Sequence, residues 1–181
     1  DNTLNTTITQ LDEDLKKEQI LSICKLKNSF WSWSIPKQLE WFKGNVKKMD
    51  INNMLTINDN LVGYTLLRKR STFIEKKHFS YFYFDTFIVH SNFRKKGLGE
   101  TLMLFNNKII KSLKKHSFLI CKKNLISFYV KFNWKILPVT RFKIMDHRPF
   151  WFTNKSSING MTYNFSNKVK KKNLYYINSK K

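Results

Sequence analysis

The chain has 181 residues, of which 41% are hydrophobic and 15% aromatic, and this composition excludes a disordered protein and predicts a sizeable core. Its 34 Lys and Arg against 12 Asp and Glu give a net charge of +22, so nucleic acid, anionic membranes and anionic small molecules are candidate partners. No apolar run approaches the roughly 20 residues of a transmembrane helix, and no signal peptide is visible. The two cysteines lie too far apart for a metal-binding pair. We therefore expect a cytoplasmic protein with two free thiols, no membrane span and no metal.

The lysine excess has two explanations. The chain has no alanine and only five arginines, while Lys, Asn, Ile and Phe are abundant, which is the pattern that an AT-rich genome produces whatever the function. Selection for polyanion binding is expected to retain arginine, whose planar guanidinium suits phosphate. Codon usage is therefore the favoured explanation, although the positive field still attracts an anionic cofactor or substrate.

In chain order, hydrophobic periodicity and turn signals predict alternating strands and helices. The predicted elements are a strand at 4–10, a helix at 15–26, an aromatic loop at 30–35, a helix from about Ser34 to about Met49, strands at 54–58, 61–70 and 79–89, a helix at 100–115, a strand at 118–121, a helix at 125–132 and a strand at 134–137. Residues 58–60 are expected to form a hairpin turn, and Gly63 to mark a bulge. Leu102, Phe105, Ile109 and Leu113 are predicted to share one face of the helix at 100–115.

Further strand-like segments fall within 139–165, and no repeat or linker divides the chain. We predict one domain over residues 1–166. A basic C-terminal tail follows over 167–181, and Tyr175-Tyr176-Ile177 within it is a candidate edge strand.

Six residues between the strand at 79–89 and the helix at 100–115 have the pattern of an anion-binding turn. They read Arg94-Lys95-Lys96-Gly97-Leu98-Gly99. Unpaired backbone N–H groups converge at a helix N-terminus, where the helix dipole also favours negative charge, and glycine permits a tight turn and close approach. A P-loop would need Gly-Lys-Ser/Thr after the glycines and a Rossmann turn would need Gly-x-Gly-x-x-Gly, and neither is present. The alternative is an ordinary strand-to-helix turn.

In this setting, Arg/Gln-x-x-Gly-x-Gly/Ala resembles the acyl-CoA pyrophosphate loop of the GNAT acetyltransferase superfamily. Members often read Leu-x-Val-x-Pro-x-Tyr/Phe-Arg upstream, and this chain reads Phe87-Ile88-Val89-His90-Ser91-Asn92-Phe93-Arg94. A second superfamily motif, Asn-x-x-Ala/Ser-x-x-x-Tyr-x-Lys-x-Gly-Phe/Trp, resembles the segment from Asn124, in which Tyr129, Lys131 and Trp134 are kept. Asn133 replaces the usual glycine, and Asn is the residue that best tolerates the left-handed conformation expected at a helix end. The shorter spacing from Asn124 to Tyr129 leaves the role of Asn124 open.

The resemblance implies an α/β (α+β mixed sheet) fold, the GNAT acyl-CoA N-acyltransferase fold, in which helices flank a central, mostly antiparallel twisted sheet. It implies acetyl-CoA as co-substrate, in a gap between the strand ending at Val89 and the strand at 118–121. The pantetheine amides would pair with the backbone of Phe87 and Val89, and the pyrophosphate with the N–H groups of residues 96–100. Lys95, Lys96 or Lys131 would face the 3′-phosphate. The full set assigned to the cofactor is Phe87, Ile88, Val89, Arg94, Lys95, Lys96, Gly97, Leu98, Gly99, Glu100, Asn124 and Lys131.

The reaction implied by the resemblance is direct attack of a neutral amine on the thioester, which needs a base for the ammonium and an acid for the thiolate. Tyr129 occupies the position of the superfamily's usual general acid, and its alternative is a packed aromatic side chain. Asp85 is the candidate base because it is a carboxylate within an apolar strand, where burial would raise its pKa. Its alternative is a carboxylate fixed by a structural hydrogen bond or ion pair. His90 and His78 are lesser candidates, while His147 is expected at the surface and Cys121 in the core.

The acceptor pocket implied by the resemblance is aromatic, with Phe30, Trp31 and Trp33 as substrate-binding candidates joined by Phe150, Trp151 and Phe152, whereas Trp41 is expected to be core. Aromatic faces suit sugar rings, so we expect a small-molecule amine, an amino sugar or a nucleotide-linked amino sugar, bound by a monomer or homodimer. Protein and peptide amines remain open, and the net charge disfavours free polyamines. The competing classes are a non-enzymatic nucleic-acid-binding protein and a domain that binds acyl-CoA without catalysis.

Overall fold

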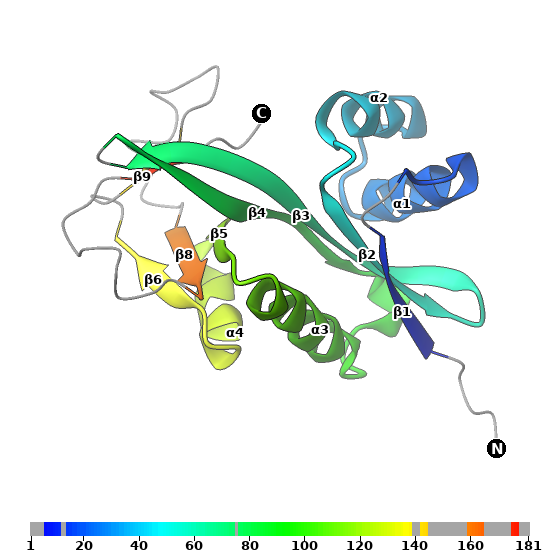
Figure 1. The fold of residues 1–181 in the computed structure, drawn as a ribbon. Coiled ribbons are helices and arrows are strands. Elements are labelled where there is room, and N and C mark those ends of the chain that lie inside the picture. Colours follow the sequence, from blue (N-terminus) through cyan, green and yellow to red (C-terminus); the bar gives the residue numbers. More distant parts are fainter. Residues whose placement is uncertain are drawn as a thin grey trace. The chain divides into compact units, whose positions relative to one another are not determined.

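The computed structural model describes residues 6–11, 14–74, 76–138, 142–144, 159–164 and 175–177. Its helices and strands follow one another as shown in Figure 1: β1 (Thr6–Leu11), α1 (Lys17–Phe30), α2 (Ile35–Asn45), β2 (Ile51–Ile57), β3 (Asn60–Ile74), β4 (Lys77–Val89), η1 (Ser91–Phe93), α3 (Leu98–Ser112), β5 (His116–Cys121), η2 (Lys123–Leu125), α4 (Ile126–Lys131), β6 (Lys135–Leu137), β7 (Phe142–Ile144), β8 (Asn159–Tyr163) and β9 (Tyr175–Ile177).

Seven strands form one mixed sheet in the order β1-β2-β3-β4-β5-β8-β6, and β7 and β9 form a separate pair. β4 and β5 are parallel, whereas β1 with β2, β2 with β3, β5 with β8 and β6 with β8 are antiparallel. The mostly antiparallel α/β sheet with flanking helices that the sequence predicts is therefore confirmed.

The chain divides into two compact units. Unit 1 comprises residues 1–68 and 86–106, and unit 2 comprises residues 69–85 and 107–181. In the part of the chain that the structure describes, no helix is long and apolar enough to cross a membrane.

The sheet of unit 1 is covered on both faces because successive side chains of a strand point to opposite sides. Met54, Tyr64 and Leu66 pack against α1 and α2. Leu55, the residue after Met54, and Val62, the extra residue where the register of β2 and β3 shifts, pack against the first turns of α3. Figure 1 shows the two layers, with α1 and α2 on one side of β2 and β3 and α3 on the other.

The core of unit 2 is built around Trp134, which is 1% exposed. Its ring stacks on Tyr163 with 5.4 Å between centroids, and its indole Nε1 donates to Oδ1 of Asn107 at 3.0 Å. Nδ2 of Asn107 in turn donates to the carbonyl of Phe132 at 3.0 Å. The buried asparagine on α3 therefore satisfies both polar groups that the end of α4 would otherwise leave without partners.

The β2–β3 hairpin has the turn and the bulge that the sequence predicts. Asn58 and Asp59 both have positive φ, 49° and 64°, as a two-residue hairpin turn with right-handed strand twist requires. The register shifts between Leu55 and Thr56, opposite the segment that contains Gly63. A Cβ on Gly63 would meet the Leu55 side chain at 3.0 Å, which is tighter than an ordinary contact, so the Leu55 side chain would have to shift to accommodate it.

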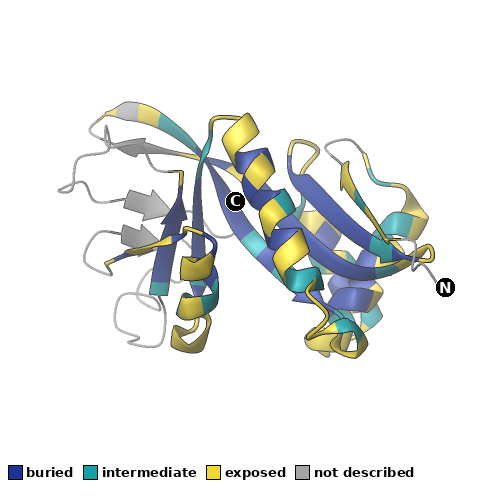
Figure 2. Cartoon of the chain, turned by 90° about the horizontal axis from the view of Figure 1, so that it is seen from below, coloured by how far each residue is buried: buried dark blue, intermediate teal, exposed yellow. Residues whose placement is uncertain are grey.

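Several helix boundaries differ from the prediction. α1 continues to Phe30, which the sequence assigned to an aromatic loop, and α2 ends at Asn45 rather than near Met49. The prediction that Leu113 shares a face of α3 is wrong, because the helix ends at Ser112. Lys114 has a positive φ of 51°, and Leu113 is 45% exposed. Figure 2 shows the alternating buried and exposed stripes along α3.

Tyr175–Ile177 does form a strand, β9, but it pairs in parallel with β7 in the small two-stranded sheet and is not an edge of the large one.

Candidate functional site

The segment after β4 makes the turn that the sequence predicts. β4 ends at Val89, η1 follows, and α3 begins at Leu98, two residues earlier than expected. Two residues between them adopt left-handed conformations, Lys95 with φ 61° and Gly97 with φ 77°. These two reversals turn the chain directly into the first turn of α3.

This turn leaves several main-chain donors without protein acceptors. The first backbone bond of α3 runs from the N–H of Thr101 to the carbonyl of Gly97 at 3.1 Å, and the Thr101 hydroxyl donates to the same carbonyl at 3.0 Å. Among the described residues, the N–H groups of residues 96–99 find no acceptor. Because these donors stand at the positive end of the helix dipole, they fit an anion such as a diphosphate. The bond from the Thr101 hydroxyl back to the carbonyl four residues earlier was not predicted, and it leaves the free N–H groups of the turn untouched.

The two glycines of the turn serve different purposes. A Cβ on Gly97 would meet nothing within 4 Å, so only its positive φ demands glycine. A Cβ on Gly99 would lie 3.6 Å from Phe87 and 3.9 Å from Val89, which is ordinary van der Waals contact. Gly97 is therefore required for its left-handed backbone conformation. Gly99 lies where α3 packs on β4, and this contact leaves room for one methyl group.

Arg94 ties the start of the turn to its surroundings. Its Nε donates to the carbonyl of Val89 at 3.0 Å, and its guanidinium lies 5.5 Å from the ring centre of Phe30 at the end of α1. Lys95 and Lys96 are exposed, and the Lys96 ammonium lies 5.5 Å from the ring of Phe93. The turn is therefore basic on its outer side and joined through Arg94 to the α1–α2 connection.

The α1–α2 connection exposes aromatic side chains. Phe30 is 50% and Trp33 48% exposed, and Trp31 is half-buried with its ring edge-on to Phe30 at 4.7 Å. Gln38 fixes the connection by donating from Nε2 to the Trp31 carbonyl at 2.8 Å. Trp41 packs against the core of unit 1, and its ring covers the buried Lys27 ammonium at 3.6 Å, which supports the structural role expected for Trp41.

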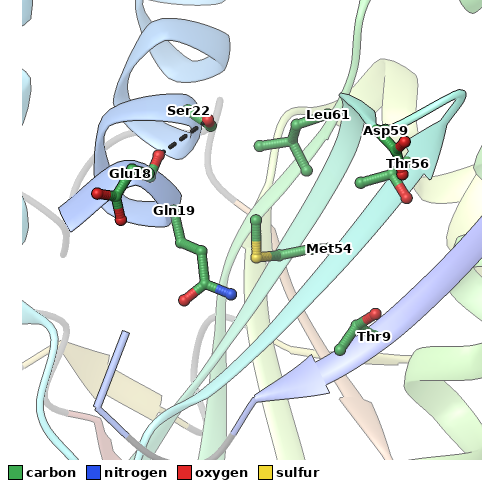
Figure 3. A pocket seen from close by; sticks show the side chains of 8 residues that line it. All are labelled: Thr9, Glu18, Gln19, Ser22, Met54, Thr56, Asp59 and Leu61. Carbon is green, nitrogen blue, oxygen red and sulfur yellow. Dashed lines mark hydrogen bonds between the residues drawn. The ribbon is translucent and has the colours of Figure 1, made fainter. Parts of the chain in front are cut away.

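A pocket of about 260 Å³ opens elsewhere on unit 1, between the first turns of α1 and the strands β1 to β3. Figure 3 shows its lining of two carboxylates, polar side chains and two apolar ones, namely Thr9, Glu18, Gln19, Ser22, Met54, Thr56, Asp59 and Leu61. None of these residues was predicted as functional. Glu18 is 12 residues before Phe30 on α1, about 18 Å along the helix axis, so the pocket is separate from the exposed aromatic group.

In unit 2, Tyr129 lies on the buried side of α4 and is 6% exposed. Its ring meets Phe84 and Trp134 edge-on at 6.4 and 6.2 Å. Burial, and to a lesser degree the neighbouring Cys121, raises the pKa of the Tyr129 phenol. Within the described part of the chain, the hydroxyl makes no hydrogen bond. Tyr129 is therefore a protonated phenol at neutral pH.

Cys121, at the end of β5, is buried as predicted. Desolvation raises the pKa of its thiol to about 11, so at neutral pH the thiol is protonated and a poor nucleophile.

The end of α4 confirms the left-handed conformation that the sequence predicts for Asn133, the asparagine that replaces glycine in the second motif. Asn133 has φ 67°, the left-handed conformation that follows a helix end. The N–H groups of Phe132 and Trp134 both donate to the Tyr129 carbonyl, at 3.0 and 3.1 Å. Lys131 and Asn124 are exposed. The helix end thus fixes the main chain at Tyr129 and leaves the side chains of Lys131 and Asn124 on the surface.

Asp85 is half-buried in β4, between the buried Phe84 and Thr86. β4 pairs with β5 over Tyr81–Tyr83, and among the described residues this register extends no further toward Asp85 although β5 continues to Cys121.

The surroundings of His90 and His78 suit the role of a general base less well than those of Asp85. Nδ1 of His90 accepts from the N–H of Asn92 at 3.2 Å and so caps η1, which occupies the nitrogen that a neutral imidazole would use as a base. His78 is exposed. The remaining predictions for His147 and for Phe150, Trp151 and Phe152 lie outside the described residues.

Comparison with known proteins agrees with this geometry. The family model described as acetyltransferase (GNAT) family matches residues 19–134. Among solved structures, ElaA of Escherichia coli is similar with a TM-score of 0.61 and 14% identity, over 87% of this chain and 99% of that one. An acyl-CoA N-acyltransferase from Pseudomonas aeruginosa has a TM-score of 0.62 and 14% identity, over 88% of this chain and 99% of that one.

An aminoglycoside 6′-N-acetyltransferase complexed with coenzyme A is also similar, with a TM-score of 0.62 and 14% identity, over 87% of this chain and 96% of that one. At these identities the structural likeness shows the fold alone. No curated protein sequence matches the chain.

Proposed function

The chain belongs to the acetyltransferase (GNAT) family, whose members transfer an acyl group from an acyl-CoA to an amine, and from this premise we propose that it acetylates a small-molecule amine with acetyl-CoA. The observation that carries the proposal is the turn at Arg94–Gly99, where the N–H groups of residues 96–99 have no acceptor among the described residues and Gly97 holds a left-handed conformation.

In this proposal the N–H groups of residues 96–99 donate to the cofactor's pyrophosphate, where the dipole of α3 adds to the attraction. Lys95 and Lys96 are exposed beside these donors and supply positive charge for the phosphates. The Arg94 Nε keeps the Val89 carbonyl in place. A carbonyl oxygen has two lone pairs, so Val89 can still accept from a pantetheine amide while Arg94 is bound.

Tyr129 is the proposed general acid for the departing thiolate. Its raised pKa keeps the proton on the phenol until the thiolate forms, and its hydroxyl has no competing partner in the described part of the chain. The proposed base is Asp85, which takes the proton that the attacking ammonium must lose before or during attack. Cys121 takes no covalent part, since a thiol with a pKa near 11 stays protonated.

The proposed acceptor is an amino sugar, free or linked to a nucleotide. The exposed rings of Phe30 and Trp33 can stack on a sugar, and the contact of Phe30 with Arg94 joins that surface to the anion-binding turn. One protein of the same fold is named for acetylating an aminoglycoside, which is an amino-sugar compound. The net charge of +22 favours an acceptor that carries a diphosphate.

The test has two stages. Thermal unfolding with and without acetyl-CoA should show stabilisation by the cofactor, because a ligand that binds only the folded state raises the midpoint. Thiol release is then followed with a panel of amino sugars, nucleotide-linked amino sugars, peptides with free N-termini and polyamines. We expect turnover with the amino sugars. No stabilisation by acetyl-CoA contradicts the enzyme, and turnover with peptides alone contradicts the acceptor class.

Phe30→Leu and Trp33→Leu variants test the aromatic surface, with Leu21→Ala, at another exposed apolar side chain of α1, as the control. The first two should raise KM for the acceptor and leave KM for acetyl-CoA unchanged, while the control changes neither.

A further inference from the structure

The positive charge of this chain is distributed very unevenly between its two units. Unit 1 contains 12 Lys and Arg and 9 Asp and Glu, a net charge of +3. Unit 2 contains 22 Lys and Arg and 3 Asp and Glu, a net charge of +19. The two units have similar lengths, so nearly all of the excess lies in unit 2.

Codon usage does not explain this asymmetry. A bias toward lysine codons acts along the whole chain, and it also favours asparagine. Asparagine is shared almost equally, with 10 residues in unit 1 and 9 in unit 2, whereas lysine is divided 10 to 19 and the acidic residues 9 to 3. Like charges on one compact unit repel one another and reduce its stability, so an excess that is confined to unit 2 calls for a role there.

The described surface of unit 2 carries many exposed lysines and few acidic residues. Nine of its described lysines are exposed, namely Lys69, Lys76, Lys108, Lys111, Lys114, Lys122, Lys123, Lys131 and Lys135. Asp85, its one described acidic residue, is half-buried in β4. Unit 1 exposes lysines as well, but five acidic side chains are also exposed among its described residues: Asp14, Glu18, Glu40, Asp59 and Glu100. Salt screens charges beyond about 8 Å at physiological ionic strength, so each surface acts through its own local charges.

The lysines of unit 2 are spread along the length of β5, with a pair at each end of the strand. Lys114 and Lys115 precede β5, and Lys122 and Lys123 follow it. A strand of six residues is about 20 Å long at roughly 3.3 Å per residue. Phosphates along one nucleic-acid strand recur about every 3.4 Å, so this distance corresponds to about six of them. The pyrophosphate and 3′-phosphate of one coenzyme A together carry fewer negative charges than the nine exposed lysines described in unit 2.

Two kinds of extended polyanion could bind such a surface, namely a nucleic-acid strand and an anionic membrane. Membrane-surface binding combines basic residues with apolar, mainly aromatic, side chains that enter the bilayer. In the described part of the chain, the exposed aromatic side chains Phe30 and Trp33 lie in unit 1, whereas the large exposed apolar residues of unit 2 are aliphatic. The charge and the aromatic anchors therefore belong to different units, which favours nucleic acid.

We propose that the surface of unit 2 binds a nucleic-acid strand through its phosphates, without reading sequence, in addition to the acetyl-transfer site. The proposal does not depend on catalysis, since none of the lysines used to test it belongs to the proposed acetyl-CoA site.

The test compares two variants with the same net charge. The unit 2 variant combines Lys108→Gln, Lys122→Gln, Lys123→Gln and Lys135→Gln, and the matched unit 1 variant combines Lys25→Gln, Lys37→Gln, Lys43→Gln and Lys48→Gln. All eight lysines are exposed, and Gln matches Lys in helix propensity. Circular dichroism and thermal midpoints establish that both variants fold.

Binding to fluorescent 20-nucleotide poly(U) RNA and poly(dT) DNA is followed by anisotropy from 50 to 300 mM salt, without acetyl-CoA. We expect the parent to bind with log Kobs falling linearly against log salt, and the unit 2 variant to bind at least about tenfold more weakly with a slope smaller by up to about 3. The unit 1 variant should stay within about twofold of the parent. A preference for one oligonucleotide identifies RNA or DNA as the partner.

Two results overturn the proposal. One is that the parent fails to bind either oligonucleotide at 50 mM salt, and sedimentation with phosphatidylserine vesicles would then identify an anionic membrane as the partner. The other is that the two variants lose affinity equally, which would reflect total charge alone. Thiol release measured on the same preparations separates this proposal from the enzymatic one, because either can fail without the other.

Discussion

The turn at residues 94–99 and the end of α4 at residues 129–134 both contain a residue with positive φ, but they offer a ligand different chemistry. At the turn, Gly97 with φ 77° directs main-chain N–H groups outward at the start of a helix. At the end of α4, Asn133 with φ 67° ends the helix, and the group offered is the phenol of Tyr129. The first region depends on backbone conformation and the second on the burial of one side chain.

This difference teaches which substitutions each region tolerates. A main-chain site is insensitive to most side-chain changes but fails when the required φ becomes costly. A side-chain site fails with the loss of one oxygen atom and is insensitive to the residues that only shape the backbone around it. Four predictions test this division, in order of decreasing effect.

The largest effect is expected from Tyr129→Phe. Loss of a general acid typically costs 10²- to 10⁴-fold in rate, so we expect kcat to fall by about that range while KM for acetyl-CoA changes less than about twofold. Steady-state thiol release measures both constants. Tyr163→Phe is the matched control, because Tyr163 is also a buried tyrosine of unit 2 and should keep its rate. Equal losses in the two variants would mean that a hydroxyl in this core acts on folding and not on catalysis.

The second prediction compares the two glycines of the turn. Alanine at a left-handed φ costs roughly 1 to 2 kcal/mol, so Gly97→Ala should weaken acetyl-CoA binding by about tenfold in calorimetry. Gly99→Ala should change the affinity little, because its Cβ would make ordinary contacts with Phe87 and Val89 at 3.6 and 3.9 Å. If Gly99→Ala is the more harmful change, the turn acts through close packing and not through conformation.

The third prediction concerns pH. The thiol of Cys121 has a folded-state pKa of about 11 against the ordinary 9.0, so the folded state holds this proton more tightly. Its contribution to stability is therefore fully present below pH 9 and is lost as the pH rises toward 11. Urea unfolding of the parent and of Cys121→Ala between pH 8 and 11 measures it, and the decline should be shallower in the variant. Thiol release at neutral pH should be unchanged by Cys121→Ala, because Cys121 takes no covalent part in the proposed reaction. Loss of activity would instead point to an acyl-enzyme on Cys121.

The smallest effect is expected at Asn133. Asn133→Gly should stabilise the protein by about 0.5 kcal/mol, because glycine adopts a positive φ at no steric cost, and Asn133→Ala should destabilise it by about 1 kcal/mol. Chemical denaturation gives both values. Neither change should alter KM for acetyl-CoA, and a change in KM without a change in stability would contradict the purely conformational role assigned to this residue.

The sequence predicts the main-chain region better than the side-chain region for a physical reason. Glycines and helix starts are local signals, so Arg94–Gly99 could be located before any fold was known, and only the start of α3 was misplaced by two residues. Asn133 was interpreted correctly on the same local basis.

Non-local relations could not be predicted in this way. The burial of Tyr129, its contact with Phe84 and the pKa shifts of Tyr129 and Cys121 depend on strands far apart in the sequence. The pocket lined by Glu18 and Asp59 was missed because its residues come from a helix, three strands and a turn and carry no common motif. The end of α1 was placed too early because Phe30 and Trp31 have the composition of a loop, whereas in the structure Phe30 still belongs to the helix and its ring contacts Arg94 and Trp31.

The central claim is that main-chain N–H groups at the start of α3 bind the cofactor's pyrophosphate. The most direct measurement is an amide NMR titration of the ¹⁵N-labelled protein with acetyl-CoA. We predict that the amide signals of Lys96, Gly97, Leu98 and Gly99 shift with the largest amplitudes in unit 1, and that they follow one saturation curve. Saturable binding of acetyl-CoA that leaves these four signals in place would contradict the claim.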